Sequence, residues 1–240
     1  MHTTILPDYE TLCDVAADLL IETVRMKPDS LICLASGDTP RGVCAALVEA
    51  AASGVADFSR CMFVGLDEWV GMDEQDEGSC SHFLWQNLFF PLALRPEQVY
   101  CMNAKSPDLQ GECDRMNTFI AQRGPLDAML VGVGLNGHLG MNEPGTPFDS
   151  VAHVSDLHET TKTVGQKYFQ RATPLSQGLT LGLKHFAEAR LPIFMASGSK
   201  KAPVVARALY EPVTTDCPAS LLQTLPHCHV LLDEAAAPAR

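Results

Sequence analysis

The sequence predicts an α/β protein: a doubly wound, mostly parallel, Rossmann-like sheet with helices on both faces, in a single domain. The first observation is an alternation of short apolar runs with longer runs of helical period from one end of the chain to the other. That alternation is typical of parallel strands joined by crossover helices. The second observation is that residues 1–240 contain no internal repeat and no low-complexity linker, so nothing marks a domain boundary.

The composition limits the classes of function. Apolar residues make up 46% of the chain and charged residues 19%, which favours a large core over disorder. The net charge of −12 provides no basic face, so we expect neither a nucleic acid nor an anionic membrane as a partner. A phosphorylated small molecule is compatible with this charge, because a few local donors can hold one phosphate.

The cysteines and the N-terminal stretch indicate the compartment. The nine cysteines are odd in number, lack C-x-x-C spacing and often lie in apolar runs, which favours reduced core thiols over a disulfide scaffold. The N-terminus has no basic flank before an apolar stretch, and no run reaches membrane-spanning length. We therefore expect a cytoplasmic protein.

The first half of the chain begins with a helix and then alternates strands and helices. Residues 8–25 carry apolar side chains at helical spacing and end before a proline, so they predict an amphipathic helix. Residues 31–35 predict a short buried strand. The turn Ser36–Pro40 follows, with a threonine and a proline placed to begin a helix through about Ala52. The remaining elements predicted here are strands at 61–66 and 99–102 and helices at 82–92 and 107–123.

The second half continues the alternation around one long polar stretch. Residues 127–133 predict a buried strand. Residues 146–163 are polar, irregular and too long for a simple connection, so 146–187 is a candidate lid. The other predicted elements are strands at 191–196 and 228–233, and helices at 178–187, after Ser197–Lys201 through Leu209, and at 218–222; the tail after 233 is expected to be loose.

The loop after strand 127–133 concentrates polar side chains. Residues 131–145 read Val-Gly-Val-Gly-Leu-Asn-Gly-His-Leu-Gly-Met-Asn-Glu-Pro-Gly, and a Gly-rich loop at the carboxyl end of a strand is where α/β folds build sites. Glu143 could hold the imidazole of His138, and Asn136 could align it or a substrate. A lone histidine is more often structural, but the flanking glycines and the nearby carboxylate favour a general acid/base.

Asp67 directly follows the strand at 61–66. A carboxylate at that position is partly desolvated, which raises its pKa and makes it a candidate proton-transfer base. A strand-end aspartate more often caps a turn. The expected position beside the His138 loop favours the catalytic interpretation, because the carboxyl ends of parallel strands meet at one edge.

Two further turns carry glycine and hydroxyl groups at the start of a helix. Ser36–Pro40 and Ser197–Lys201 would each present backbone N–H groups and a helix dipole to an anion, and Lys200 or Lys201 could add a cation. Either turn alone is more often an ordinary connection. The pair, with a lysine, favours a phosphate site. A metal site is disfavoured, since only His227 and His229 could share one face of their strand.

Together these stretches resemble the glucosamine-6-phosphate deaminase (isomerase) family. The Gly-His-x-x-x-Asn-Glu-Pro pattern is the specific part; the related 6-phosphogluconolactonases share the Gly-His portion without the Asn-Glu-Pro continuation. The matching segments, in family order, are Ser36–Pro40, Gly65–Gly71, Gly132–Gly145 and Gly198–Lys201.

The resemblance implies an activity and roles for residues. It implies conversion of an amino-sugar 6-phosphate and water to a keto-hexose 6-phosphate and ammonia, without an organic cofactor. His138, with Glu143 as its partner, would assist opening of the sugar ring, and Asp67 would move the proton between C2 and C1. The phosphate would be held by Ser36, Gly37, Thr39 and Lys201, and by Lys167, which stands where the family often has an arginine.

Three features depart from the family pattern. Asn136 stands where well-known members have an aspartate, which would weaken electrostatic support of His138. Asp38 replaces a small residue in the phosphate turn, where its charge would repel phosphate unless it points away. The chain also lacks the C-terminal extension of the allosteric hexameric members. We expect a homo-oligomer as one possible assembly.

Three functions are therefore considered. The first is an amino-sugar-6-phosphate deaminase acting on glucosamine or galactosamine 6-phosphate, which the sequence does not separate. The second is a lactonase of the same superfamily, in which His138 would activate water and Asp67 would be expendable. The third is a non-catalytic sugar-phosphate-binding protein, which would bind without turnover.

Overall fold

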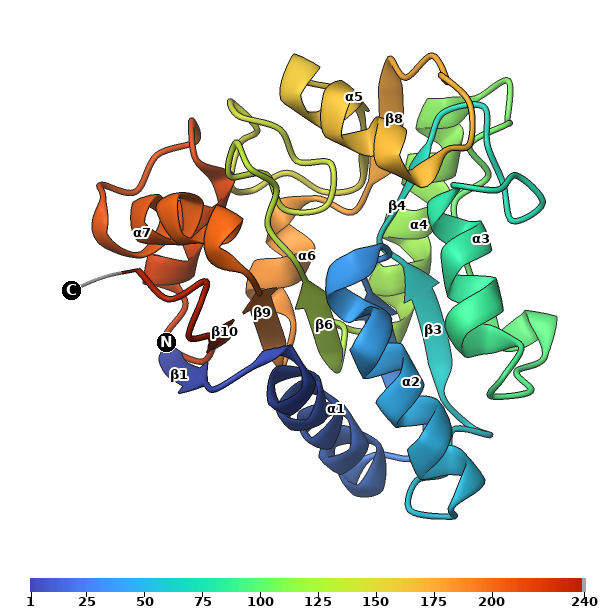
Figure 1. The fold of residues 1–240 in the computed structure, drawn as a ribbon. Coiled ribbons are helices and arrows are strands. Elements are labelled where there is room, and N and C mark those ends of the chain that lie inside the picture. Colours follow the sequence, from blue (N-terminus) through green and yellow to red (C-terminus); the bar gives the residue numbers. More distant parts are fainter. Residues whose placement is uncertain (239–240) are drawn as a thin grey trace.

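Seven parallel strands form the central sheet of the computed structural model, which describes residues 1–238 (Figure 1). The spatial order is β1-β10-β9-β6-β2-β3-β5, and every neighbouring pair is parallel. This confirms the predicted α/β class. The strands are β1 His2–Leu6, β2 Leu31–Leu34, β3 Met62–Gly65, β5 Val99–Tyr100, β6 Ala128–Val131, β9 Pro192–Ala196 and β10 His229–Asp233.

Helices cover both faces of this sheet. The α-helices are α1 Tyr9–Met26, α2 Asp38–Ala52, α3 Cys80–Leu84, α4 Leu109–Arg123, α5 Glu159–Gly165, α6 Leu183–Glu188 and α7 Ala202–Tyr210. A π-helical turn, Trp85–Phe89, continues α3, and 3₁₀ turns lie at Pro96–Gln98, Gln166–Tyr168, Ser199–Lys201 and Pro218–Thr224. None of the described helices is long and apolar enough to cross a bilayer.

The core is divided by the sheet into two layers because successive strand residues point to opposite faces. In β2, Ile32 and Leu34 pack with α1, α2 and the 80–89 helical segment. Their neighbours Leu31 and Cys33 pack instead with α4, α6 and α7. Eight of the nine cysteines are buried and all nine are free thiols, as the sequence predicted.

A second, smaller sheet stands beside the carboxyl edge of the first. It consists of β4 Asp67–Trp69, β8 Gln177–Thr180 and β7 His153–Asp156, in the order β4-β8-β7, and both pairs are antiparallel. Figure 1 shows β3 and β6 pointing toward the region of α5 and β8. The second sheet therefore joins the segment after β3 to the long excursion between β6 and α6.

Several sequence predictions were wrong in this region. Residues 67–71 were expected to form a loop, but the first three form β4. Residues 146–163 were expected to be irregular, yet they contain β7 and most of α5. The helix predicted at 178–187 is β8 followed by the shorter α6. These strands are only three or four residues long, and their pairing partners are distant in sequence, so local periodicity does not identify them.

The two ends of the chain also differ from the prediction. Strand β1 was not predicted, because it is an edge strand whose side chains are mostly exposed and partly polar. The tail was expected to be loose, but Ala236 is fully buried, and the Glu234 N–H donates to the carbonyl of Leu6. Residues 239–240 of that tail lie outside the described residues.

The amino edge of the sheet is tied together by one buried carboxylate. Asp127, immediately before β6, accepts hydrogen bonds from Lys27 Nζ at 2.6 Å and from the Leu31 N–H at 2.8 Å. Arg190 Nε lies 3.4 Å from its other oxygen. Asp127 thus links α1, β2 and the segment before β9 at the end of the sheet opposite the loops that carry the site.

Candidate active site

The four predicted strand-end loops line one cavity of about 760 Å³ at the carboxyl edge of the central sheet. The loops after β2, β3, β6 and β9 contribute, respectively, Ser36 to Arg41, Asp67, the 132–138 stretch and Ser197 to Lys201. The segment 160–168 closes a further side. The cavity thus brings Ser36, Gly37, Thr39, Asp67, His138, Lys167 and Lys201 together; Asn136 and Glu143 stand behind His138.

His138 is held by groups on its Nδ1 side. Nδ1 lies 3.1 Å from Thr161 Oγ1 and 3.4 Å from Glu143 Oε2. A carboxylate at this distance favours the tautomer with a proton on Nδ1, which leaves Nε2 as the ring nitrogen able to exchange a proton with a bound molecule. Gly134 is required beneath the ring, because a Cβ there would lie 2.2 Å from the imidazole.

Glu143 is buried yet ionised. Burial by itself would raise the pKa of Glu143, but the hydrogen bond and charge of His138, with hydrogen bonds from Thr161 and Asn136, lower it to about 2. Asn136 Nδ2 donates to Glu143 Oε2 at 2.8 Å. The departure at Asn136 therefore has a physical account: a neutral amide supplies a donor to Glu143, whereas an aspartate would place a second negative charge at the same contact.

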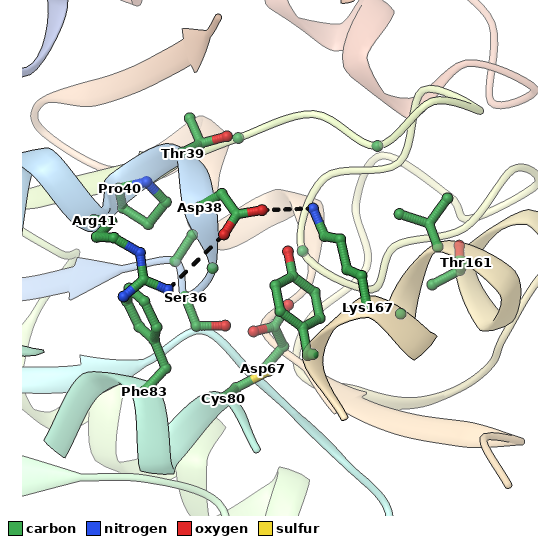
Figure 2. Close-up of a pocket in the computed structure, with 18 of the residues that line it drawn as sticks. Ser36, Asp38, Thr39, Pro40, Arg41, Asp67, Cys80, Phe83, Thr161 and Lys167 are labelled. Atoms are coloured by element: carbon green, nitrogen blue, oxygen red, sulfur yellow. Dashed lines mark hydrogen bonds and ion pairs between the residues drawn. The ribbon is translucent and has the colours of Figure 1, made fainter. Parts of the chain in front are cut away.

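Asp67 lies at the meeting point of the two sheets. It is the first residue of β4, opposite Thr180 of β8, and its side chain faces the cavity. Burial raises the pKa of Asp67 to about 7, and the negative charge of Glu68 adds to this, while a hydrogen bond with the Cys80 thiol acts in the other direction. Figure 2 shows Cys80 directly beside the Asp67 carboxyl group. Asp67 thus titrates near neutral pH, as a proton-transfer group requires.

Glu68, which sequence reasoning did not single out, fixes the segment around Asp67. Its side chain is buried and accepts the N–H groups of Trp69, Cys80 and Ser81 and the hydroxyl of Ser79. The carboxylate therefore caps the start of α3 and anchors Cys80 against the site. The Asp-Glu sequence after a strand contains both residues, but only the fold shows that the second one turns away from the cavity.

The turn Ser36–Pro40 has the geometry of an anion-binding turn. Gly37 has φ +98°, and a Cβ there would lie 2.7 Å from the Tyr168 hydroxyl, so the position requires glycine on both grounds. The turn opens α2, whose first N–H groups have no partner within the helix. Tyr9 supports it from behind by donating to the carbonyls of Asp38 and Thr39.

The turn Ser197–Lys201 offers fewer free hydrogen-bond donors for an anion than the sequence predicted. The Ser197 hydroxyl donates to Asp233 at 2.5 Å and the Gly198 N–H to the same carboxylate at 3.0 Å, so both donors are already occupied. Lys201 Nζ donates to the Val133 carbonyl at 2.5 Å and also lines the cavity. Burial lowers the pKa of Lys201, and the charge of Lys167 adds to the effect.

Consecutive residues of the segment 160–170 make contacts across the mouth of the cavity. Lys167 Nζ lies 2.8 Å from Asp38 Oδ2, and Tyr168 lies over Gly37. Phe169 packs on Gly78, with its ring centroid 6.4 Å from that of Trp69. Gln170 donates to Glu77 at 2.9 Å.

Thr161, on α5, was missed from the sequence, because a threonine in a polar stretch carries no local signal of a contact with a histidine 23 residues earlier.

A doubly wound sheet with an imidazole, carboxyl groups and two lysines around one cavity at its carboxyl edge defines an α/β enzyme. Comparison with known proteins identifies the family. The model of the glucosamine-6-phosphate isomerases/6-phosphogluconolactonase family matches residues 8–230. The chain belongs to this family.

Two of the sequence relatives named glucosamine-6-phosphate deaminase are each 36% identical to this chain. The protein from Geobacillus sp. (strain WCH70) is 36% identical over 230 residues, covering 95% of this chain and 92% of the relative. The protein from Bacillus velezensis (strain DSM 23117 / BGSC 10A6 / LMG 26770 / FZB42) is 36% identical over 238 residues, covering 99% of both chains.

Solved structures agree with the family. One described as a monomeric glucosamine-6-phosphate deaminase superposes with a TM-score of 0.95 at 31% identity, covering 98% of both chains. The 6-phosphogluconolactonase from Trypanosoma brucei superposes with a TM-score of 0.80 at 19% identity, covering 98% of this chain and 97% of the other. The second similarity shows the fold alone.

Proposed function

We propose that the protein is an amino-sugar-6-phosphate deaminase. It converts glucosamine 6-phosphate, or galactosamine 6-phosphate, and water to a keto-hexose 6-phosphate and ammonia. One observation carries the proposal: a carboxyl group with a pKa of about 7, Asp67, faces the same cavity as the His138–Glu143 pair. The relatives at 36% identity support the same activity.

The first step is opening of the sugar ring. His138 Nε2 takes the proton of the anomeric hydroxyl and returns one to the ring oxygen, which gives the open-chain aldehyde. Glu143 balances the positive charge that the imidazole carries between the two transfers. Thr161 and Asn136 hold the His138 ring and the Glu143 carboxylate in place and are positioning residues.

The second step is isomerisation. Asp67 removes the proton from C2 while the C1 oxygen gains the proton that the C2 ammonium group loses, which gives an enolamine. Asp67 then delivers its proton to C1, so that C1 becomes a hydroxymethyl group and C2 becomes an iminium carbon. Water adds to C2 and ammonia leaves, which gives the ketone. A carboxyl group that is half ionised near pH 7 suits both the removal and the delivery of this proton.

The phosphate binds at the α2 end of the cavity. Ser36, Gly37 and Thr39 supply hydroxyl and backbone donors there, and Lys167 and Lys201 supply positive charge. Lysine in place of the family's usual arginine keeps the charge of this contact but loses the bidentate geometry of a guanidinium group. Residues 146–187 act as a lid, because they carry Lys167 and Thr161 to the cavity and contact both of its rims.

The setting of the reaction follows from the same proposal. The enzyme works in amino-sugar catabolism, including the breakdown of N-acetylglucosamine, in the reducing cytoplasm, where its thiols stay free. A homo-oligomer remains a prediction from the sequence; the solved structure at 31% identity is described as monomeric. Sedimentation of the purified protein decides between the two assemblies.

A coupled ammonia assay on glucosamine 6-phosphate and galactosamine 6-phosphate tests the activity, with Asp67→Asn as the decisive variant. Loss of the general base is expected to lower kcat by about 10²- to 10⁴-fold. A lactonase would hydrolyse 6-phosphogluconolactone equally well in both proteins, and a binding protein would release no ammonia in either. The absence of ammonia from both amino sugars with the wild-type protein would contradict the proposal.

A further inference from the structure

The cavity already contains an anion of its own at the phosphate turn. Asp38 is the first residue of α2, and its Oδ2 lies 2.8 Å from Nζ of Lys167, which is 129 residues away in the sequence. Its other oxygen lies 3.8 Å from a guanidinium nitrogen of Arg41. Figure 2 shows the Asp38 carboxylate between these two cations, on the wall that Ser36 and Thr39 share.

A carboxylate at this position has two opposing effects. At the first turn of a helix it stabilises the helix, because it faces the positive end of the helix dipole. It also places a negative charge among the donors that the proposed function assigns to a dianionic phosphate. A phosphate that reaches Lys167 must compete with Asp38 for this ammonium group, or accept the repulsion of a neighbouring carboxylate.

We infer that Asp38 is an affinity-setting residue of the anion site: it holds Lys167 while the site is empty and must release it when phosphate binds. This inference rests on the phosphate site of the proposed function. We call the pair of side chains the Asp38–Lys167 latch. The ligand class that it weakens is that of phosphate monoesters and inorganic phosphate.

Surrounding contacts fit a role as a resident counter-ion. Lys167 and Lys201 line the same cavity; the charge of Lys167 lowers the pKa of Lys201, and that of Asp38 raises it. Burial would lower the pKa of Lys167, but its contacts with Asp38 and Tyr168 outweigh this effect and raise it. Asp38 therefore holds the charged lysine over the cavity before the substrate arrives.

The latch is weak enough to be displaced. The Lys167 side chain is 48% exposed and that of Asp38 63%, so solvent screens their attraction. Pairs of this exposure contribute little, and replacing the carboxylate is expected to change phosphate affinity by about threefold to tenfold. Asp38 thus adjusts affinity and does not abolish binding.

Calorimetric titration of inorganic phosphate into four proteins tests the latch: wild type, Asp38→Ser, Lys167→Met and the double variant. Asp38→Ser is expected to bind phosphate about threefold to tenfold more tightly than wild type. The double variant is expected to gain less over Lys167→Met than Asp38→Ser gains over wild type, because most of the gain requires the released lysine. Asp38→Asn repeats the test with an isosteric side chain.

Glu159→Ser is the matched control. Glu159 is also a first-turn acid of a helix paired with a lysine, since its carboxylate lies 2.8 Å from Lys162 Nζ, but it does not line the cavity. Its replacement removes the same charge from the same position of a helix. Phosphate affinity is expected to stay within twofold of wild type.

Three titration results would overturn the latch. The first is an unchanged phosphate affinity in Asp38→Ser. The second is a gain of the same size in the Lys167→Met background, which would make Asp38 only a through-space charge. The third is failure of all four proteins to bind phosphate. A gain that depends on Lys167, without ammonia release from either amino sugar, would support the latch and contradict the proposed activity.

Kinetics give a second readout if the protein has the proposed activity. The KM of Asp38→Ser for glucosamine 6-phosphate is expected to fall by the same factor as the phosphate dissociation constant, with no rise in kcat. A KM that does not change, while phosphate binds more tightly, would mean that the sugar phosphate does not use Lys167 and would also overturn the latch.

Discussion

At the scale of single residues, the site is a set of partners that set one another's charge. Glu143 stays ionised because His138, Thr161 and Asn136 all offer it donors. Asp67 is the opposite case, since its pKa is raised to about 7 by burial and by a neighbouring carboxylate. One acid is therefore held as a fixed anion while the other can exchange a proton near neutral pH.

The hydroxyl of Thr161 gives a prediction about His138. Thr161→Val keeps the shape of the side chain but removes the hydrogen bond that the Nδ1–H of His138 donates to the hydroxyl, which is worth about 1 kcal/mol, so kcat is expected to fall by about fivefold with little change in KM. Thr161→Ser should restore most of kcat. Steady-state kinetics check both variants; an equal loss in the serine and valine variants would mean that packing, and not the hydrogen bond, is what matters.

The pKa of Asp67 gives a prediction about pH. Only the ionised carboxylate can remove a proton, so kcat/KM, which reports the free enzyme, is expected to fall about tenfold per pH unit below an apparent pKa of about 7 and to level off above it. The Cys80 hydrogen bond lowers this pKa, so Cys80→Ala should move the acidic limb to higher pH, while Cys80→Ser should leave it near wild type. A limb that shifts downward in Cys80→Ala would contradict this assignment.

At the scale of elements, short strands determine where the residues of the site lie. Strand β4 places Asp67, and β8 joins β4 to the excursion that carries Thr161 and Lys167. The proposed lid is thus anchored at its far end in a small sheet and held at its tip by side-chain contacts. The sequence Lys-Tyr-Phe-Gln at 167–170 supplies one contact per residue along the mouth of the cavity.

Phe169 tests this description of the proposed lid. Phe169→Ala removes the packing on Gly78 and the edge contact with Trp69, worth about 1–2 kcal/mol, so KM is expected to rise about fivefold to thirtyfold. Phe90→Ala is the control, because Phe90 is 60% exposed and lies outside the cavity. An equal rise in KM for both variants would mean that the contacts of Phe169 have no special role.

The sequence was most informative where the signal is local. The long helices α1, α2 and α4 and the buried strands β2, β3, β6 and β9 follow from periodicity, and four turns could be assigned to one edge because parallel strands share it. The small sheet could not be predicted, because its strands are only three or four residues long and one of its two pairings, β4 with β8, connects segments more than 100 residues apart. Thr161 and Glu68 were missed for the same reason: their roles depend on contacts that no local pattern encodes.

At the scale of the whole molecule, the two edges of the central sheet differ in what their buried charges do. The carboxyl edge carries the groups that face the cavity. The amino edge carries Asp127, which connects α1, β2 and the segment before β9 through two cations and one backbone N–H. Stability and chemistry are thus supported at opposite ends of the same strands.

Asp127→Ala separates these two roles. The change leaves the buried N–H of Leu31 without its acceptor and frees two cations, so the free energy of unfolding is expected to fall by about 2–3 kcal/mol. Thermal unfolding should occur about 4–10 °C lower. Ammonia release per folded molecule should match wild type at 25 °C. A loss of kcat without loss of stability would contradict this division.

The small sheet has one more consequence. Asp67 belongs to the β4-β8-β7 ribbon, whereas His138 follows a strand of the large sheet. The acid and the imidazole are therefore carried by different sheets. Thr180 of β8 joins the two, because its hydroxyl accepts a hydrogen bond from the Met141 N–H at 3.1 Å, so a shift of the small sheet would move the imidazole loop together with the acid.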